Sequence, residues 1–271
     1  MKIVDRRTVV TAAGLAPLVA CTHHRDGHTK GPRKPDPVPP DPKPGDPGPE
    51  GDLSWRGYHW LRRTWPGGPQ YNRRWSPDNV TLEADDTITL RMSNPGADPV
   101  GAELVSTRTG WGYGTYRCAV ETTFDSVGPS LVWGGMFTYD PEQVYPQGHN
   151  ELDSGEISAW GVVGRVPRLI GGYWVDGPRN VVSHDVELPG DLRHFVFEMV
   201  WEPGAITWTT WGGTSAADTA IASSSVRPTD VPVPADERVH FNIWVTALHD
   251  SDPATTPSHS ARLTDFVFTP A

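Results

Sequence analysis

The chain has 271 residues, and its 33 acidic side chains outnumber its 23 basic ones, which gives a net charge of −10. Residues 1–52 carry eight basic and seven acidic side chains, so residues 53–271 hold the excess negative charge, about −11. Such a domain repels polyanions. We therefore expect no nucleic acid partner, and the charge also disfavours a polyanionic polysaccharide.

Residues 1–21 have the pattern of a signal peptide. Lys2 and Arg6-Arg7 precede an apolar run from Val9 to Ala20, which is too short to span a bilayer. Twin arginines are typical of proteins that are exported after folding. The end of the run, Leu18-Val19-Ala20-Cys21, resembles the lipobox of bacterial lipoproteins. We predict an exported lipoprotein at the cell surface, held to the membrane only by a lipid on Cys21; the alternative is a secreted protein cleaved near Ala20.

Residues 22–52 are rich in proline, most densely between Pro32 and Pro49. Such a segment is extended and cannot bury a core, so we predict a disordered stalk that lifts the following domain off the membrane. A leader without a spacing role is the alternative. If Cys21 carries lipid, Cys118 is the one remaining thiol, and no internal disulfide can form. We place Cys118 in a strand as a small buried hydrophobe rather than as a catalytic thiol.

Residues 53–271 have the pattern of one all-β domain. Short runs alternate between apolar and polar residues, as in 87–92, 115–123 and 239–246, and no window of ten or more residues has a helical period. In the last run Val239 and Phe241 would face inward, with His240 and Asn242 on the opposite face. Many short strands separated by glycine and proline predict a sandwich of two antiparallel sheets.

Three carboxylates lie within six residues, at Glu151, Asp153 and Glu156. On a strand Glu151 and Asp153 share a face, and one extra residue in a bulge at Ser154-Gly155 would bring Glu156 to the same face. Crowded carboxylates raise at least one pKa, which gives the ionised nucleophile and protonated acid that a retaining glycosidase needs. The alternative is a solvated acidic turn. Leu152 and Ile157, which alternate with the acids, favour the strand.

This pattern resembles family 16 of the glycoside hydrolases, retaining endo-acting enzymes with a concanavalin-like β-jelly-roll fold. Glu151-Leu152-Asp153-Ser154-Gly155-Glu156 matches the bulged form of the family signature, Glu-x-Asp-x-x-Glu. The resemblance implies that Glu151 is the nucleophile, Glu156 the acid/base, and Asp153 the helper between them. Ser154-Gly155 departs from the family, in which the two residues before the last Glu are usually apolar.

The resemblance covers most of residues 55–268. Gly112-Tyr113-Gly114 is similar to the opening of a family strand, and residues 132–139 are similar to the aromatic strand beside the active site. Trp201-Glu202-Pro203-Gly204 followed by Ile206-Thr207-Trp208 resembles another family element, and residues 265–268 resemble the last jelly-roll strand. The bulged signature looks more like that of laminarinase-type members than of lichenase-type ones, which implies a β-1,3-glucan as first substrate.

All twelve tryptophans lie between Trp55 and Trp244. Indole rings stack on the apolar faces of sugars, so tryptophans in a cleft can hold a neutral glycan, although core packing is the alternative for each. We assign Trp201 and Trp208 to the core. Trp133, Trp160 and Trp244 are the candidate sugar platforms, and Asn242 is a candidate ligand for sugar hydroxyls.

Taken together, the sequence predicts a monomeric, retaining endo-glycosidase that acts on a β-linked polysaccharide and uses neither a cofactor nor a metal ion. One rival is a non-catalytic lectin on the same scaffold, which would explain the tryptophans but not three acids in phase. A second rival is a polysaccharide lyase. A lyase needs a neutral base and a cation to balance the uronate charge, and the Glu151–Glu156 segment supplies acids instead.

Overall fold

The computed structural model describes residues 51–124, 127–145, 148–175, 179–227 and 231–271. The predicted signal peptide, Cys21 and residues 22–50 of the predicted stalk lie outside these ranges. Within them, no helix is both long enough and apolar enough to cross a bilayer. The strands are β1 (Leu53–Trp55), β2 (Tyr58–Arg62), β3 (Val80–Leu82), β4 (Ile88–Met92), β5 (Ala102–Ser106), β6 (Gly114–Glu121), β7 (Leu131–Tyr145), β8 (Gly148–Ser158), β9 (Arg168–Val175), β10 (Arg179–Glu187), β11 (His194–Glu202), β12 (Ala205–Gly213), β13 (Thr219–Val226), β14 (Arg238–Val245) and β15 (His259–Pro270).

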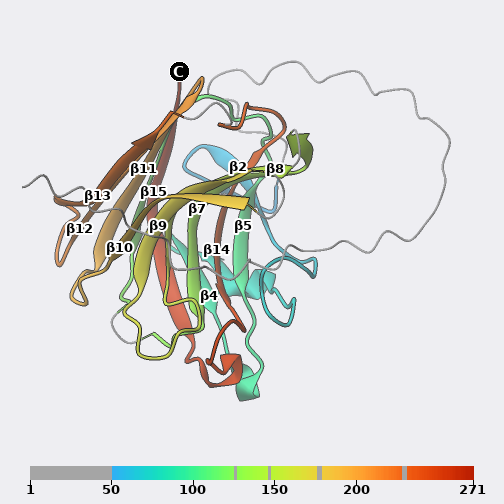
Figure 1. Ribbon diagram of the computed structural model, residues 1–271. Helices are drawn as coiled ribbons and strands as arrows, with labels where there is room; N and C mark the ends of the chain where they lie inside the picture. The colour runs from blue at the N-terminus through green and yellow to red at the C-terminus, as the bar shows by residue number, and fades with distance from the viewer. Residues whose placement is uncertain (1–50, 125–126, 146–147, 176–178, 228–230) are drawn as a thin grey trace, which may run out of the picture.

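The strands form two antiparallel sheets. An eight-stranded sheet has the order β1-β2-β5-β14-β7-β8-β9-β10, and a seven-stranded sheet has the order β13-β12-β11-β6-β15-β4-β3. In Figure 1 each layer therefore mixes strand colours from early and late in the chain. The short helices η1 (Pro77–Asn79), η2 (Pro95–Ala97) and η3 (Pro253–Thr255) are single 3₁₀ turns. The predicted all-β sandwich is confirmed.

The core lies between the sheets, as strand alternation requires. In β14 Val239, Phe241, Ile243 and Val245 are fully buried, which confirms the predicted inward face. Cys118 is buried with them, and burial raises the pKa of its thiol well above the ordinary range, as expected for an inert core residue. The predicted core positions of Trp201 and Trp208 are also confirmed.

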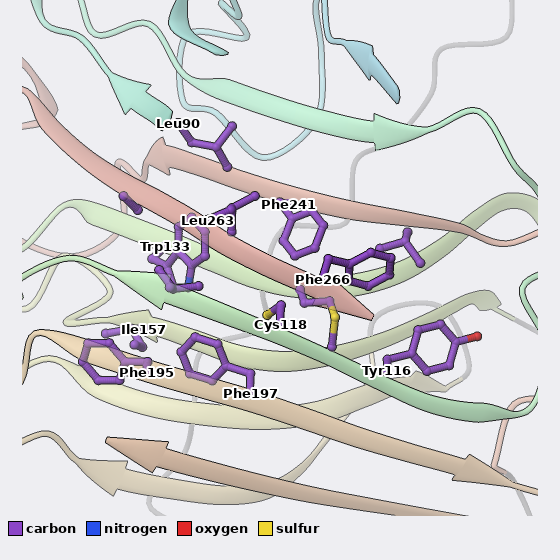
Figure 2. Close-up of a cluster of buried hydrophobic side chains, with 14 of the residues drawn as sticks. Leu90, Tyr116, Cys118, Trp133, Ile157, Phe195, Phe197, Phe241, Leu263 and Phe266 are labelled. Atoms are coloured by element: carbon purple, nitrogen blue, oxygen red, sulfur yellow. The ribbon is translucent and has the colours of Figure 1, made fainter. Parts of the chain in front are cut away.

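Trp133 is the one predicted sugar platform that the fold contradicts. It is 0% exposed, it pairs with the core residue Ile157 of β8, and Figure 2 shows it among core side chains such as Phe241 and Leu263. A ring enclosed between the sheets cannot stack on a sugar. The prediction was wrong because the glycines that follow Trp133 do not mark an open surface.

Trp133→Ala should therefore act on stability. Removing the indole ring leaves a cavity among packed core side chains, which is expected to lower the free energy of unfolding by about 3–5 kcal/mol. Trp65→Ala is the matched control because Trp65 is 43% exposed; it should cost no more than about 1 kcal/mol. Urea unfolding of both variants measures the difference, and equal losses would place Trp133 outside the core.

The predicted bulge in β8 is present. Between Asp153 and Glu156, β8 advances three residues while the facing positions on β9 advance two, from Gly172 to Ile170. Gly155 occupies the left-handed region, with φ of +76°, which favours glycine. A Cβ atom on Gly155 would lie 2.3 Å from the Phe197 ring, so the bulge also needs the space that only glycine leaves.

A matching irregularity in β7 was not predicted. The register of β7 against β14 shifts by one residue between Asn242 and Ile243, where Gly134 is the extra residue. The neighbouring Gly135 has φ of +72°. Because β7 and β8 carry their irregularities side by side, their mutual register stays regular from Trp133↔Ile157 to Met136↔Ser154. The eight-stranded sheet is thus reshaped across two strands at the level of the acids.

Candidate active site

The three acids lie on the outer face of the eight-stranded sheet. Leu152 and Ile157 of β8 are buried in the core, so Asp153 and Glu156, their immediate neighbours, point the other way. Glu151 pairs with Tyr139, and Asp153 pairs with Phe137, on β7. The side chain of Asp153 is hydrogen bonded to Glu151, and the charges of Glu151 and Glu156 both act on it. The bulge therefore brings the three carboxyls together.

Two of the three carboxyls have raised pKa values. Burial of the carboxyl raises the pKa of Asp153 well above its usual range, and the charges of Glu151 and Glu156 raise it further. Burial also raises the pKa of Glu156 to about 8, and the charge of Glu151 adds to that rise. With this pKa Glu156 holds a proton near neutral pH, and the raised pKa of Asp153 favours its protonated form as well. A protonated acid, Glu156, thus belongs to the same cluster of carboxyls as Glu151.

Two indole groups donate hydrogen bonds to this cluster. Trp174 of β9 bonds to Asp153, and Trp160, just after β8, bonds to Glu156; each bond favours the carboxylate and so lowers the pKa of its partner. The sequence analysis missed Trp174. Its signal is the alternation of β9, in which buried Tyr173 places Trp174 on the face of the acids.

Trp160 and Trp244 form an aromatic group next to the acids. Their ring centroids lie 5.8 Å apart at an interplanar angle of 70°, and Trp244 packs with Trp75 and Val132 in a small cluster separate from the core. Trp160 is partly exposed, whereas Trp244 is only 6% exposed. Both rings are therefore on the outer face, although Trp244 is almost completely buried there.

Asn242 lies on the same face, over Gly134 of β7. A Cβ atom on Gly134 would lie 1.9 Å from Asn242 Oδ1, so the absence of a side chain at 134 makes room for the amide. Asn242 is 4% exposed, and its Oδ1 has no hydrogen-bond partner among the described residues. A buried amide oxygen without a partner is uncommon in proteins.

A buried polar chain lies beside Asn242. Arg63 forms an ion pair with Glu103 at 2.5 Å, and His240 Nδ1 lies 2.7 Å from the other Glu103 oxygen. Although burial opposes ionisation, His240 and Arg63 hold the pKa of Glu103 below its usual value. Phe137 stacks on His240 with centroids 4.9 Å apart. The alternation of residues in β14 predicted that His240 lies on this face, but its pairing with Glu103 and Arg63 depends on segments far apart in the sequence.

Comparisons with protein-family models and with curated proteins find no match. Solved structures do match. The β-glucanase of Bacillus licheniformis superposes with a TM-score of 0.58 at 16% identity, covering 78% of this chain and 92% of that one. A glycoside hydrolase family 16 endo-glucanase from Bacteroides ovatus gives a TM-score of 0.57 at 9% identity, covering 78% and 94%. A pseudo β-1,3-glucanase of Mycobacterium tuberculosis, an immunostimulatory antigen, gives 0.57 at 17% identity, covering 77% and 89%.

The chain has the jelly-roll fold of these β-glucanases. At such identities the likeness establishes the fold alone, and the chemistry has to be argued from the residues of this chain. Among the described residues, no group of three or more His, Cys, Asp or Glu side chains is arranged to hold a metal ion.

Proposed function

We propose that the protein is a retaining endo-glycosidase that hydrolyses a β-linked, neutral polysaccharide. The observation that carries the proposal is the set of three carboxyls on one face of β8, in which burial and neighbouring charge raise the pKa values of Asp153 and Glu156. A retaining glycosidase needs one carboxylate to attack the sugar and one carboxylic acid to protonate the leaving group. The solved structures of similar fold that are named β-glucanases support the same class of reaction.

The roles follow from the charges. Glu151 attacks the anomeric carbon while Glu156 gives its proton to the glycosidic oxygen, so that the aglycone leaves and a glycosyl ester forms on Glu151. Glu156, now ionised, takes a proton from water, which attacks the anomeric carbon of the glycosyl ester and releases Glu151 as a carboxylate. Asp153, protonated and hydrogen bonded to Glu151, holds the nucleophile in place and stabilises its charge.

The substrate would lie across the outer face of the eight-stranded sheet. The partly exposed ring of Trp160 offers apolar surface for a sugar ring, and Trp244 and Asn242 lie on the same face with little exposed surface of their own. We propose a β-1,3-glucan as first substrate and a mixed-linkage β-1,3-1,4-glucan as the next to test. The test is the release of reducing ends from a panel of neutral and charged glycans, and no release from any β-glucan would reject the proposal.

A non-catalytic glycan-binding domain is the second candidate. It is favoured by one specific observation, the pseudo β-1,3-glucanase among the proteins of similar fold. Such a domain would bind a glucan and leave its chain length unchanged. Titration calorimetry and size-exclusion chromatography of the same glucan after incubation distinguish the two, because an endo-acting enzyme shortens the chain rapidly.

The chain ahead of the domain motivates a proposal about its location. Arg6-Arg7 and the segment ending in Cys21 predict export and lipid attachment. Cys21→Ala should move the protein from the membrane fraction to the soluble fraction. The melting temperature of the domain should not change, because a proline-rich segment such as the predicted stalk is not expected to contribute to a core. Mass spectrometry of the mature N-terminus provides the check, and an N-terminus without lipid would contradict the anchor.

A further inference from the structure

The turn that follows β8 has a strained backbone at a bulky residue. Trp160 has φ of +54°, in the left-handed region that L-residues with large side chains seldom adopt, and Gly161 follows with φ of +79°. A Cβ atom on Gly161 would lie 1.9 Å from the carbonyl oxygen of Leu248. Strain of this kind persists only where surrounding contacts fix it, and it gathers at functional sites.

Those contacts come from both sides of the turn. The backbone N–H of Trp160 donates to Ser158 Oγ at 2.8 Å, and the Ser158 hydroxyl donates to the carbonyl oxygen of Leu131 at 2.7 Å. The Gly161 N–H donates to the carbonyl oxygen of Pro129 at 2.8 Å. The turn is therefore attached to the segment that leads into β7 and packed against the segment that follows β14.

The consequence of the turn is the position of the indole. Four residues of extended strand would separate the Cα atoms of Glu156 and Trp160 by about 13 Å. The left-handed turn instead brings the ring back, so that its N–H group bonds to the Glu156 side chain while its edge contacts Trp244. The strain thus accompanies a contact with the proposed general acid.

An indole N–H is a donor only. On a protonated carboxyl it favours the carbonyl oxygen, which leaves the O–H group of Glu156 free to point at the glycosidic oxygen. When Glu156 gives up its proton, the same bond becomes charge-assisted and stronger. An interaction that strengthens as the proton leaves lowers the barrier of the step rather than merely binding substrate.

We propose that Trp160 is a positioning residue for the general acid, held in a strained turn so that its indole N–H orients the Glu156 carboxyl and stabilises the carboxylate left after proton transfer. This inference rests on the proposed function, in which Glu156 is the acid. It gives Trp160 a role that does not depend on stacking against sugar.

Within the described residues, charged side chains near Glu156 lie on β8 and on the strands beside it. On β8 they are Glu151 and Asp153. The other described groups have partners of their own: on β7 Asp140 accepts the backbone N–H of Asp236, on β9 Arg168 pairs with Asp185 at the edge of the sheet, and on β14 His240 bonds to Glu103. A change in the titration of Glu156 on loss of the indole N–H is therefore assigned to that donor.

Trp160→Phe removes the N–H group and keeps an aromatic ring, and Trp211→Phe, on the outer face of β12, is the matched control. With substrates whose leaving group needs a proton, kcat/KM of Trp160→Phe should fall roughly fivefold to tenfold, the scale of one lost hydrogen bond. With 2,4-dinitrophenyl glycosides it should change less than about twofold, since that leaving group needs no proton. The alkaline limb of the pH profile should move to higher pH. Equal losses on both substrates with an unmoved limb would make Trp160 a sugar platform and overturn the inference.

A second measurement does not need turnover. In protein with ¹³C-labelled Glu carboxyls, the Glu156 resonance, assigned with Glu156→Gln, should titrate at higher pH in Trp160→Phe than in the parent, and Trp211→Phe should match the parent. If no glycan is cleaved but this shift is seen, the proposed function fails and the contact stands. If glycans are cleaved but the shift and the leaving-group dependence are both absent, the role of Trp160 is rejected.

Discussion

Glu151→Ala should abolish formation of the glycosyl-enzyme and lower kcat roughly 10⁴-fold or more, the scale seen when a covalent nucleophile is removed. The reason is that neither of the other two carboxyls is a ready substitute, since their raised pKa values favour the protonated forms, which are poor nucleophiles. The variant should stay folded because it removes one charge from a crowded site. Steady-state kinetics on the best glucan of the panel, with trapping of the intermediate by mass spectrometry, measure the effect.

Glu202→Ala is the control for this variant, since Glu202 is an exposed glutamate at the end of β11, and its activity should equal that of the parent. Glu156→Ala provides the complement. It should slow both chemical steps, least with leaving groups that need no proton, and azide should restore turnover by forming a glycosyl azide of retained configuration. An inverted azide product, or full activity of Glu151→Ala on every substrate, would contradict the assigned roles.

The pKa of Glu156 also sets a pH dependence. Activity that needs the protonated acid should fall as the pH rises through about 8. The folded-state pKa lies above the unfolded value, so the protonated carboxyl favours folding below about pH 4.5, and that contribution is lost progressively as the pH rises to about 8. Glu156→Ala removes this loss and should make stability less dependent on pH over that interval.

Gly155→Ala should damage the site through a single added methyl group. The new Cβ atom would lie 2.3 Å from the Phe197 ring, and the residue would have to keep φ of +76°. Overpacking and left-handed strain together should lower the free energy of unfolding by about 2–4 kcal/mol. Relaxing the bulge instead would turn Glu156 toward the core. Either way, activity should fall with stability.

Gly57→Ala separates the two causes of that loss. Gly57 has φ of +80°, but a Cβ atom there meets nothing within 4 Å, so this variant carries the strain without the clash. It should cost about 1 kcal/mol. Urea denaturation of both variants gives the comparison. If Gly155→Ala lowers the free energy of unfolding no more than Gly57→Ala does, the Phe197 ring can move aside at little cost. The bulge then does not depend on a glycine at this position.

Local pattern was enough to predict the sandwich and the β8 bulge. Alternation in β14 placed Phe241 inward and Asn242 outward, and the glycine at 155 marked the extra residue that the spacing of the acids requires. These features depend on residues that are neighbours along the chain. The short-range signal is strong because one face of each strand must be buried.

The features that could not be predicted from the sequence depend on the register between strands. Trp133 was misassigned because the glycines after it resemble an open edge, whereas pairing with Ile157 turns its ring inward. Trp174 reaches Asp153 from β9, and Arg63 reaches Glu103 from the segment after β2, through pairings that no local pattern encodes. The left-handed backbone of Trp160 likewise depends on contacts with distant loops.

The most direct test of the account is the configuration of the first product. ¹H NMR of a β-glucan mixed with a high concentration of the protein follows the new reducing ends before they mutarotate. Double displacement through Glu151 predicts that the β-anomer appears first and the α-anomer only later. Initial appearance of the α-anomer, or the absence of any new reducing end, would contradict the proposed role of the three carboxyls of β8.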